Sequence, residues 1–135
     1  MYCYWTGEAT LGKVDGVIAS RIGHWSGREI VQVDYDPSLT SAEQLVAALK
    51  KQRSLYAEVQ GSDQSPVEGS SSNHEQVQLQ GKPHFIEPKH SLRTRYPQIA
   101  ALDLTEAQAI ALNTWSYFGG PMPDVLTPEQ KKLLQ

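Results

Sequence analysis

Thiols are nearly absent from this chain, because Cys3 is the only cysteine among its 135 residues. One thiol cannot form an internal disulfide, so the cysteine content leaves the redox compartment open. No apolar run approaches ~18 residues, so neither a membrane-spanning helix nor a membrane partner is predicted. No charged, apolar leader opens the chain, so no secretory signal is expected. The default expectation is a cytoplasmic protein, or a periplasmic one if a leader has been removed.

A basic surface is lacking as well. The formal net charge is −3 and the sequence pI is about 5.8. No run of Lys and Arg stands out, so a nucleic-acid partner is not expected. The histidines show none of the H-x-x-H or H-E-x-x-H spacings that are typical of metal sites; they are His24, His74, His84 and His90. We therefore predict no metal and no cofactor.

The lone thiol lies in an aromatic setting, Tyr2-Cys3-Tyr4-Trp5. Residues 4–13 are predicted to form a short helix with one face made of Tyr4, Gly7, Glu8 and Leu11. Cys3 then lies at a helix N-terminus, where unpaired backbone N–H groups favour a thiolate. The alternative is a sulfur that is simply buried under the two aromatic rings.

The next segments alternate between strand and helix patterns. Residues 17–23 and 29–35 are predicted to form an antiparallel hairpin. A capping box at 40–43 opens a helix whose apolar face is Ala42, Leu45, Val46 and Leu49. Residues 55–59 read as one more strand. This order predicts an α/β fold, a ferredoxin-like two-layer α/β sandwich with extra C-terminal helices.

Only two residues precede Cys3, so the usual first strand of that sandwich is missing. An open sheet edge exposes unpaired N–H and C=O groups. We expect the segment 84–86, the segment 77–79 or a second chain to cover it, which makes a homodimer through this edge a candidate assembly.

We divide the chain into three parts. Residues 1–60 form the α/β core, and residues 61–81 form a flexible loop rich in Gly, Ser and Gln. Residues 82–135 form a C-terminal helical extension that packs on the same domain. Its longest helix starts at the capping box 105–108, and its predicted core stripe is Ala107, Ile110, Ala111, Thr114, Trp115 and Phe118.

The N-terminal half resembles the peptide methionine sulfoxide reductases of the A type, which carry a Gly-Cys-Phe-Trp-Gly-x-Glu motif. Cys3, Trp5 and Glu8 match this motif, and Tyr4 stands for its Phe. A Gly-Val turn at 16–17 and a Tyr-Asp-Pro at 35–37 follow in the family's order. The resemblance runs from Tyr2 to about Leu49.

The resemblance implies a thiol-dependent oxidoreductase in which Cys3 attacks a methyl sulfoxide. Glu29 would be the acid, because it matches the glutamate that begins the strand leading to Tyr-Asp-Pro. Strand alternation independently puts Glu29 on the covered face with Val31, Val33 and Tyr35. A salt bridge from Glu29 to Arg21 or Arg28 is an equally acceptable interpretation.

The resemblance also implies the partners of the reaction. Tyr4 and Trp5 would bind the methyl group of a methionine sulfoxide or a related substrate, and a thioredoxin or glutathione-type thiol would regenerate Cys3. His24, Glu8 and Asp63 are further candidates for the site.

The chain departs from the family in two respects. It lacks the loop that carries one active-site tyrosine, and it lacks the C-terminal cysteines that many members use to resolve the oxidised one. Two alternatives share the fold. One is a heavy-metal-associated domain, which the segment 56–59 fits although Cys3-Tyr4-Trp5-Thr6 offers a single thiolate. The other is a catalytically inactive thiol redox or interaction module.

Overall fold

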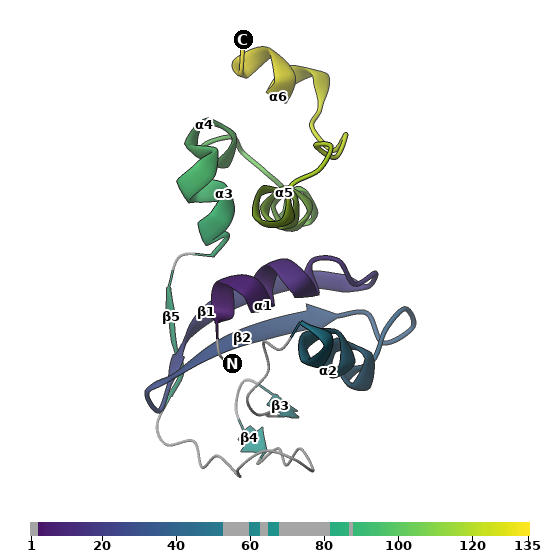
Figure 1. Cartoon of the computed structure of the whole chain (residues 1–135), viewed down its shortest axis with the longest axis vertical. Coiled ribbons are helices and arrows are strands. Elements are labelled where there is room, and N and C mark those ends of the chain that lie inside the picture. Colours follow the sequence, from purple (N-terminus) through teal and green to yellow (C-terminus); the bar gives the residue numbers. More distant parts are fainter. Residues whose placement is uncertain (1–2, 53–59, 63–64, 68–81, 87) are drawn as a thin grey trace.

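The computed structural model describes residues 3–52, 60–62, 65–67, 82–86 and 88–135, and it shows a mixed α/β protein (Figure 1). A three-stranded antiparallel sheet has the strand order β2-β1-β5, and a separate pair joins β3 to β4. The α/β class predicted from the sequence is therefore confirmed. The strands are β1 (Val17–Trp25), β2 (Arg28–Tyr35), β3 (Gln60–Ser62), β4 (Ser65–Val67) and β5 (His84–Ile86). The helices are α1 (Tyr4–Leu11), α2 (Ala42–Lys51), α3 (His90–Arg95), α4 (Pro97–Ala100), α5 (Glu106–Phe118) and α6 (Pro128–Leu133).

The predicted hairpin is present, with a tighter turn than expected. Ser26 and Gly27 both have positive φ, 50° and 73°, as the central residues of a two-residue hairpin turn require. Strand β1 therefore continues to Trp25 instead of ending at Gly23. The register places His24 opposite Glu29 at the turn end of the sheet.

The first core lies between this hairpin and the helices α1 and α2. Leu11, Leu45 and Leu49 are its buried centre. The apolar residues of the hairpin that pack against this centre are Val17, Val31, Val33 and Tyr35. The predicted apolar face of α2 is thus used. Its predicted cap is wrong by one residue, because Ser41, and not Thr40, accepts the hydrogen bond from the Gln44 backbone N–H.

The short strand β5 joins the sheet beside β1, not beside β2. In a β-α-β-β-α-β unit the first strand pairs with the strand that corresponds to β2. The segment 84–86 therefore does not take its place. The outer edge of β2 has no strand partner among the described residues. The expected strands at 55–59 and 77–79 lie outside the described residues, and a homodimer through this edge stays a prediction.

The second core lies between α3, α4, α5 and the segment just before α6, above α1 in Figure 1. Its buried members are Leu92, Ile99, Leu112 and Leu126. The stripe predicted for α5 is only partly right, because Phe118 is exposed while Leu112, Asn113 and Ser116 are buried. The reason is that α5 contacts α1 on one side and α3 on another, so it buries more than one face. None of the helices in the described ranges is long and apolar enough to cross a bilayer.

Gly23 is required for the contact between β1 and β5. A Cβ atom at this position would collide with the carbonyl oxygen of His84 and lie 2.8 Å from the Cα of Phe85. Both are backbone atoms, so neither can move aside without displacing β5. We expect Gly23→Ala to cost about 1–3 kcal/mol and to lose the amide protection of residues 84–86, measured by hydrogen exchange. Gly27→Asn is the control, since nothing lies within 4 Å of its Cβ position and asparagine tolerates positive φ. Intact protection in Gly23→Ala would contradict this prediction.

Candidate functional site

Cys3 is the N-cap residue of α1, as its position before the aromatic pair predicts. Its side chain is half-buried and makes no capping hydrogen bond to the helix. The next backbone N–H, that of Tyr4, instead donates to Oε1 of Glu29 at 3.2 Å. Glu29 therefore points from β2 toward the start of α1, on the face that strand alternation predicts. The carboxylate of Glu29 therefore contacts the backbone of Tyr4, the residue that directly follows Cys3.

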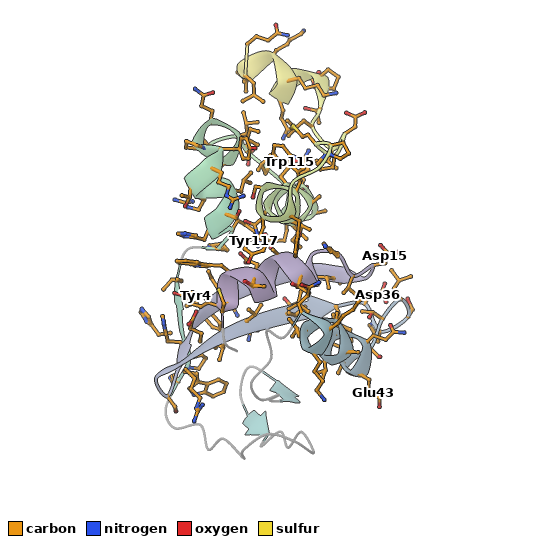
Figure 2. The ribbon with its side chains drawn as sticks, viewed as in Figure 1. Tyr4, Asp15, Asp36, Glu43, Trp115 and Tyr117 are labelled. Atoms are coloured by element: carbon orange, nitrogen blue, oxygen red, sulfur yellow. The ribbon has the colours of Figure 1, made fainter. Side chains whose placement is uncertain are left out.

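Aromatic rings surround this position. The ring of Tyr4 meets the ring of His24 edge-on at 5.3 Å and lies 5.8 Å from the ring of Trp5. Figure 2 shows Tyr4 at the start of α1, close to the sheet. Loss of solvent raises the pKa of the Tyr4 hydroxyl, and the negative charges of Glu29 and Cys3 raise it further. The phenol therefore stays in its O–H form and can donate a hydrogen bond.

His24 links this site to the third strand. It lies opposite Glu29 in β2 and opposite His84 in β5, so these three residues form one row across the sheet. Direct cross-strand neighbours have Cβ atoms roughly 4.5–5.5 Å apart. The middle residue of the row, His24, contacts the Tyr4 ring. The strand bounds predicted from the sequence, 17–23 and 29–35, leave His24 in the turn between them, whereas the structure includes it in β1.

A residue from the C-terminal segment also reaches the site. The imidazole of His90, the first residue of α3, stacks on the indole of Trp5 with ring centroids 3.9 Å apart and an angle of 4° between the planes. Trp5 remains 39% exposed. Figure 2 also shows Tyr117 of α5, whose hydroxyl shares a hydrogen bond with Thr6 in the first turn of α1.

Glu8 has a different setting from the other candidates. It is only 3% exposed, and both of its carboxylate oxygens accept hydrogen bonds from interior groups. Oε1 accepts from the Lys89 backbone N–H at 2.8 Å and from Nδ2 of Asn113 at 3.4 Å. Oε2 accepts from Oγ of Ser20 and from Nζ of Lys89. Burial raises the pKa of Glu8, and the charge and hydrogen bonds of Lys89 oppose that rise.

Lys89 joins this carboxylate to the edge of the sheet. Its Nζ lies 2.9 Å from Oε1 of Glu106 and donates to the Ser20 carbonyl oxygen at 3.1 Å. Oε1 of Glu106 in turn accepts from the Ser20 backbone N–H. The ion pair thus satisfies both backbone groups of Ser20 where β5 no longer pairs with β1. Sequence reasoning missed Lys89, Asn113 and Glu106.

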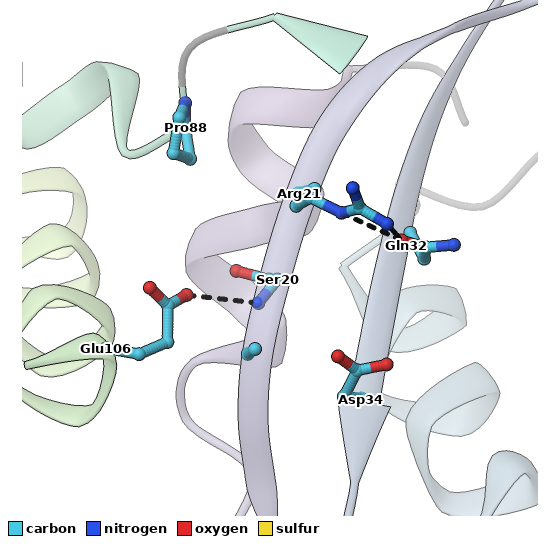
Figure 3. Close-up of a pocket in the computed structure, with 7 residues that line it drawn as sticks. Ser20, Arg21, Gln32, Asp34, Pro88 and Glu106 are labelled. Atoms are coloured by element: carbon cyan, nitrogen blue, oxygen red, sulfur yellow. Dashed lines mark hydrogen bonds between the residues drawn. The ribbon is translucent and has the colours of Figure 1, made fainter. Parts of the chain in front are cut away.

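An open hollow of about 490 Å³ lies beyond this ion pair (Figure 3). Its lining residues are Ala19, Ser20, Arg21, Gln32, Asp34, Pro88 and Glu106. Arg21 and Gln32 pair across β1 and β2 and alternate with the residues that face the helices, so the hollow lies on the other face of the sheet. Cys3 does not line it. Arg21 also covers the Phe85 ring, which argues against its predicted salt bridge to Glu29.

Two expectations remain without a structural answer. Asp63 lies outside the described residues, so its place relative to Cys3 stays a prediction. Among the residues that the structure describes, no group of three or more His, Cys, Asp or Glu side chains could hold a metal ion.

The chain is similar to peptide methionine sulfoxide reductase MsrA 1 of Nostoc sp.. The two sequences are 34% identical over 62 residues, which cover 33% of this chain and 38% of the relative. The relationship to that reductase is distant. The chain thus matches well under half of the relative's length. No family model matches the chain, and no solved structure is significantly similar to it.

Proposed function

We propose that this protein is a thiol-dependent oxidoreductase that reduces a methyl sulfoxide of the methionine type. The observation that carries the proposal is the hydrogen bond from the Tyr4 N–H to Glu29, which brings a carboxyl group to the residue next to the lone thiol. The relative in Nostoc is named as a reductase of peptide methionine sulfoxide, which supports the same chemistry.

The proposed reaction transfers one oxygen atom from the substrate to the enzyme. The Cys3 thiolate attacks the electrophilic sulfur of the sulfoxide and forms an S–S bond, while Glu29 delivers a proton to the oxygen, which leaves as hydroxide as the S–O bond breaks. The hydroxide then adds to Sγ of Cys3, and the S–S bond breaks to release the sulfide. The substrate leaves as a sulfide, reduced by two electrons, and Cys3 is oxidised to a sulfenic acid. Two external thiols then restore Cys3, with the release of one water and one disulfide.

Three neighbouring side chains have roles that fit this reaction. The protonated Tyr4 hydroxyl can donate to the sulfoxide oxygen, a function that replaces the tyrosine of the missing family loop. Trp5 offers an apolar surface to the methyl group. A protonated His24 would favour the thiolate form of Cys3. We assign Glu8 a structural role, because it is buried and both of its carboxylate oxygens already accept hydrogen bonds from interior groups.

The same proposal includes the finer topology. We infer a ferredoxin-like sandwich in which α1 and α2 cover one face of the β1–β2 hairpin. The shared core of Leu11, Leu45 and Leu49 supports this arrangement. The reductant is proposed to be a thioredoxin or glutathione-type thiol.

The proposal is tested by sulfide formation from methyl p-tolyl sulfoxide with and without dithiothreitol. With one cysteine in the chain, the oxidised Cys3 has no internal thiol to condense with. We expect many turnovers with dithiothreitol, and without it at most one sulfide per chain together with a sulfenic acid that dimedone traps. Multiple turnovers with a non-thiol reductant alone would refute the external-thiol step. The absence of sulfide under every condition would refute the proposed function and leave an interaction module, which a Cu(I) titration would separate from a heavy-metal-associated one.

A further inference from the structure

His90 lies outside the part of the chain that resembles the reductases, yet it contacts a proposed substrate-binding residue. Its ring covers one face of the Trp5 indole at 3.9 Å and is nearly parallel to it. Such a stack fixes the orientation of both rings, whereas an exposed indole on a first helical turn would otherwise sample several rotamers.

The position of His90 is itself strongly determined. The preceding residue, Lys89, has a left-handed backbone with φ of 61°, which is unfavourable for a residue other than glycine. Glu8 holds it there through two hydrogen bonds, one from the Lys89 backbone N–H and one from its Nζ. Within α3, Nε2 of His90 also lies 3.4 Å from Oγ1 of Thr94, one turn further along the helix.

The two contacts together clamp α3 to the first turns of α1. Trp5 and Glu8 are three residues apart and so lie on the same side of α1. They contact the consecutive residues His90 and Lys89. The buried Glu8–Lys89 ion pair therefore fixes the backbone just before His90, and with it the position of the His90 ring over the Trp5 indole.

We infer that His90 is a positioning residue that holds the Trp5 indole as the apolar wall against which the methyl group of the sulfoxide binds. The inference rests on the proposed function. The stacked face of the indole is covered, and the 39% of Trp5 that stays exposed is the surface left for a substrate. The C-terminal segment thus completes a site whose thiol and carboxyl groups come from the N-terminal half.

The test separates binding from turnover by using the Cys3→Ser chain, which retains the wall but cannot react. Tryptophans are replaced by 5-fluorotryptophan, and the ¹⁹F resonance of Trp5 is assigned with Trp5→Phe. Methyl p-tolyl sulfoxide is then titrated while this resonance is followed. Removing the stack with His90→Ala should shift the free Trp5 resonance and weaken sulfoxide binding roughly 3–10-fold, as expected for an aromatic pair. His90→Phe keeps a flat ring and should restore the affinity.

Tyr96→Ala is the matched control, because it removes another aromatic stack of the C-terminal segment, that of Tyr96 on Trp115. It should leave the Trp5 resonance and the affinity unchanged. In chains with an intact thiol, His90→Ala should raise KM by the same factor at nearly constant kcat, since the wall acts on substrate and transition state alike. Equal or tighter binding in His90→Ala would overturn the inference, because the imidazole would then occupy the place of the substrate. A wild-type chain that binds the sulfoxide at Trp5 but forms no sulfide would refute the proposed function and retain the positioning role.

Discussion

Replacing Glu29 with glutamine should slow sulfide formation by about 10²–10⁴-fold, the usual contribution of a general acid. Replacing Cys3 with serine should abolish it, because a hydroxyl is a far weaker nucleophile than a thiolate. The glutamine keeps the carbonyl oxygen that can accept from the Tyr4 N–H, so the cap of α1 is preserved and only the transferable proton is lost. The measurement is the single-turnover rate of sulfide formation at saturating methyl p-tolyl sulfoxide.

Glu43→Gln is the matched control for this substitution, because Glu43 is an exposed carboxylate in the first turn of α2. It changes the net charge by the same amount and should leave the rate unchanged. Circular dichroism and the melting temperature of each variant check that the fold is intact. A Glu29→Gln chain with the wild-type rate would show that Glu29 only caps α1, and the acid would have to be sought elsewhere.

Local patterns predicted which face of β2 carries Glu29 and that Cys3 directly precedes a helix. The alternation of β2 placed Glu29 on the helix-covered face, and its hydrogen bond to the Tyr4 N–H is on that face. The position of Cys3 before a helix followed from the spacing of the apolar residues in α1. Such predictions succeed because the periods of strands and helices are properties of the backbone itself.

The contacts of the C-terminal segment could not be predicted in the same way. Lys89 and Asn113 both donate hydrogen bonds to Glu8, although they are 81 and 105 residues away from it in the sequence. No local pattern in residues 89–95 shows that Lys89 is only 5% exposed. The capping residue of α2 was missed because Thr40 and Ser41 are both good caps, and the local pattern does not select between them.

The second large effect should come from this buried lysine. Lys89→Met should lower the free energy of unfolding by about 3–5 kcal/mol, because it leaves the charge of Glu8 buried without a cationic partner and removes the hydrogen bond to the Ser20 carbonyl oxygen. For a chain of this size that is roughly 10–20 °C in melting temperature. Lys131→Met is the matched control: its ion pair with Asp124 is 54% and 85% exposed, and such pairs contribute about 0–1 kcal/mol.

The loss in Lys89→Met should also depend on pH in a defined direction. The pKa of Glu8 is raised by burial, so the stability associated with its neutral form is present below the unfolded value of about 4.3 and is lost as pH rises through the folded pKa. Lys89 opposes that rise, so its removal should raise the pKa of Glu8 further. The difference in melting temperature between Lys89→Met and wild type should therefore be smallest near pH 5 and grow toward pH 8.

Adding Glu8→Gln to Lys89→Met should remove this dependence and recover part of the stability, since no charge then remains at that position. If the difference in melting temperature between Lys89→Met and wild type became smaller toward pH 8, a charged Glu8–Lys89 pair between α1 and the C-terminal segment would be contradicted.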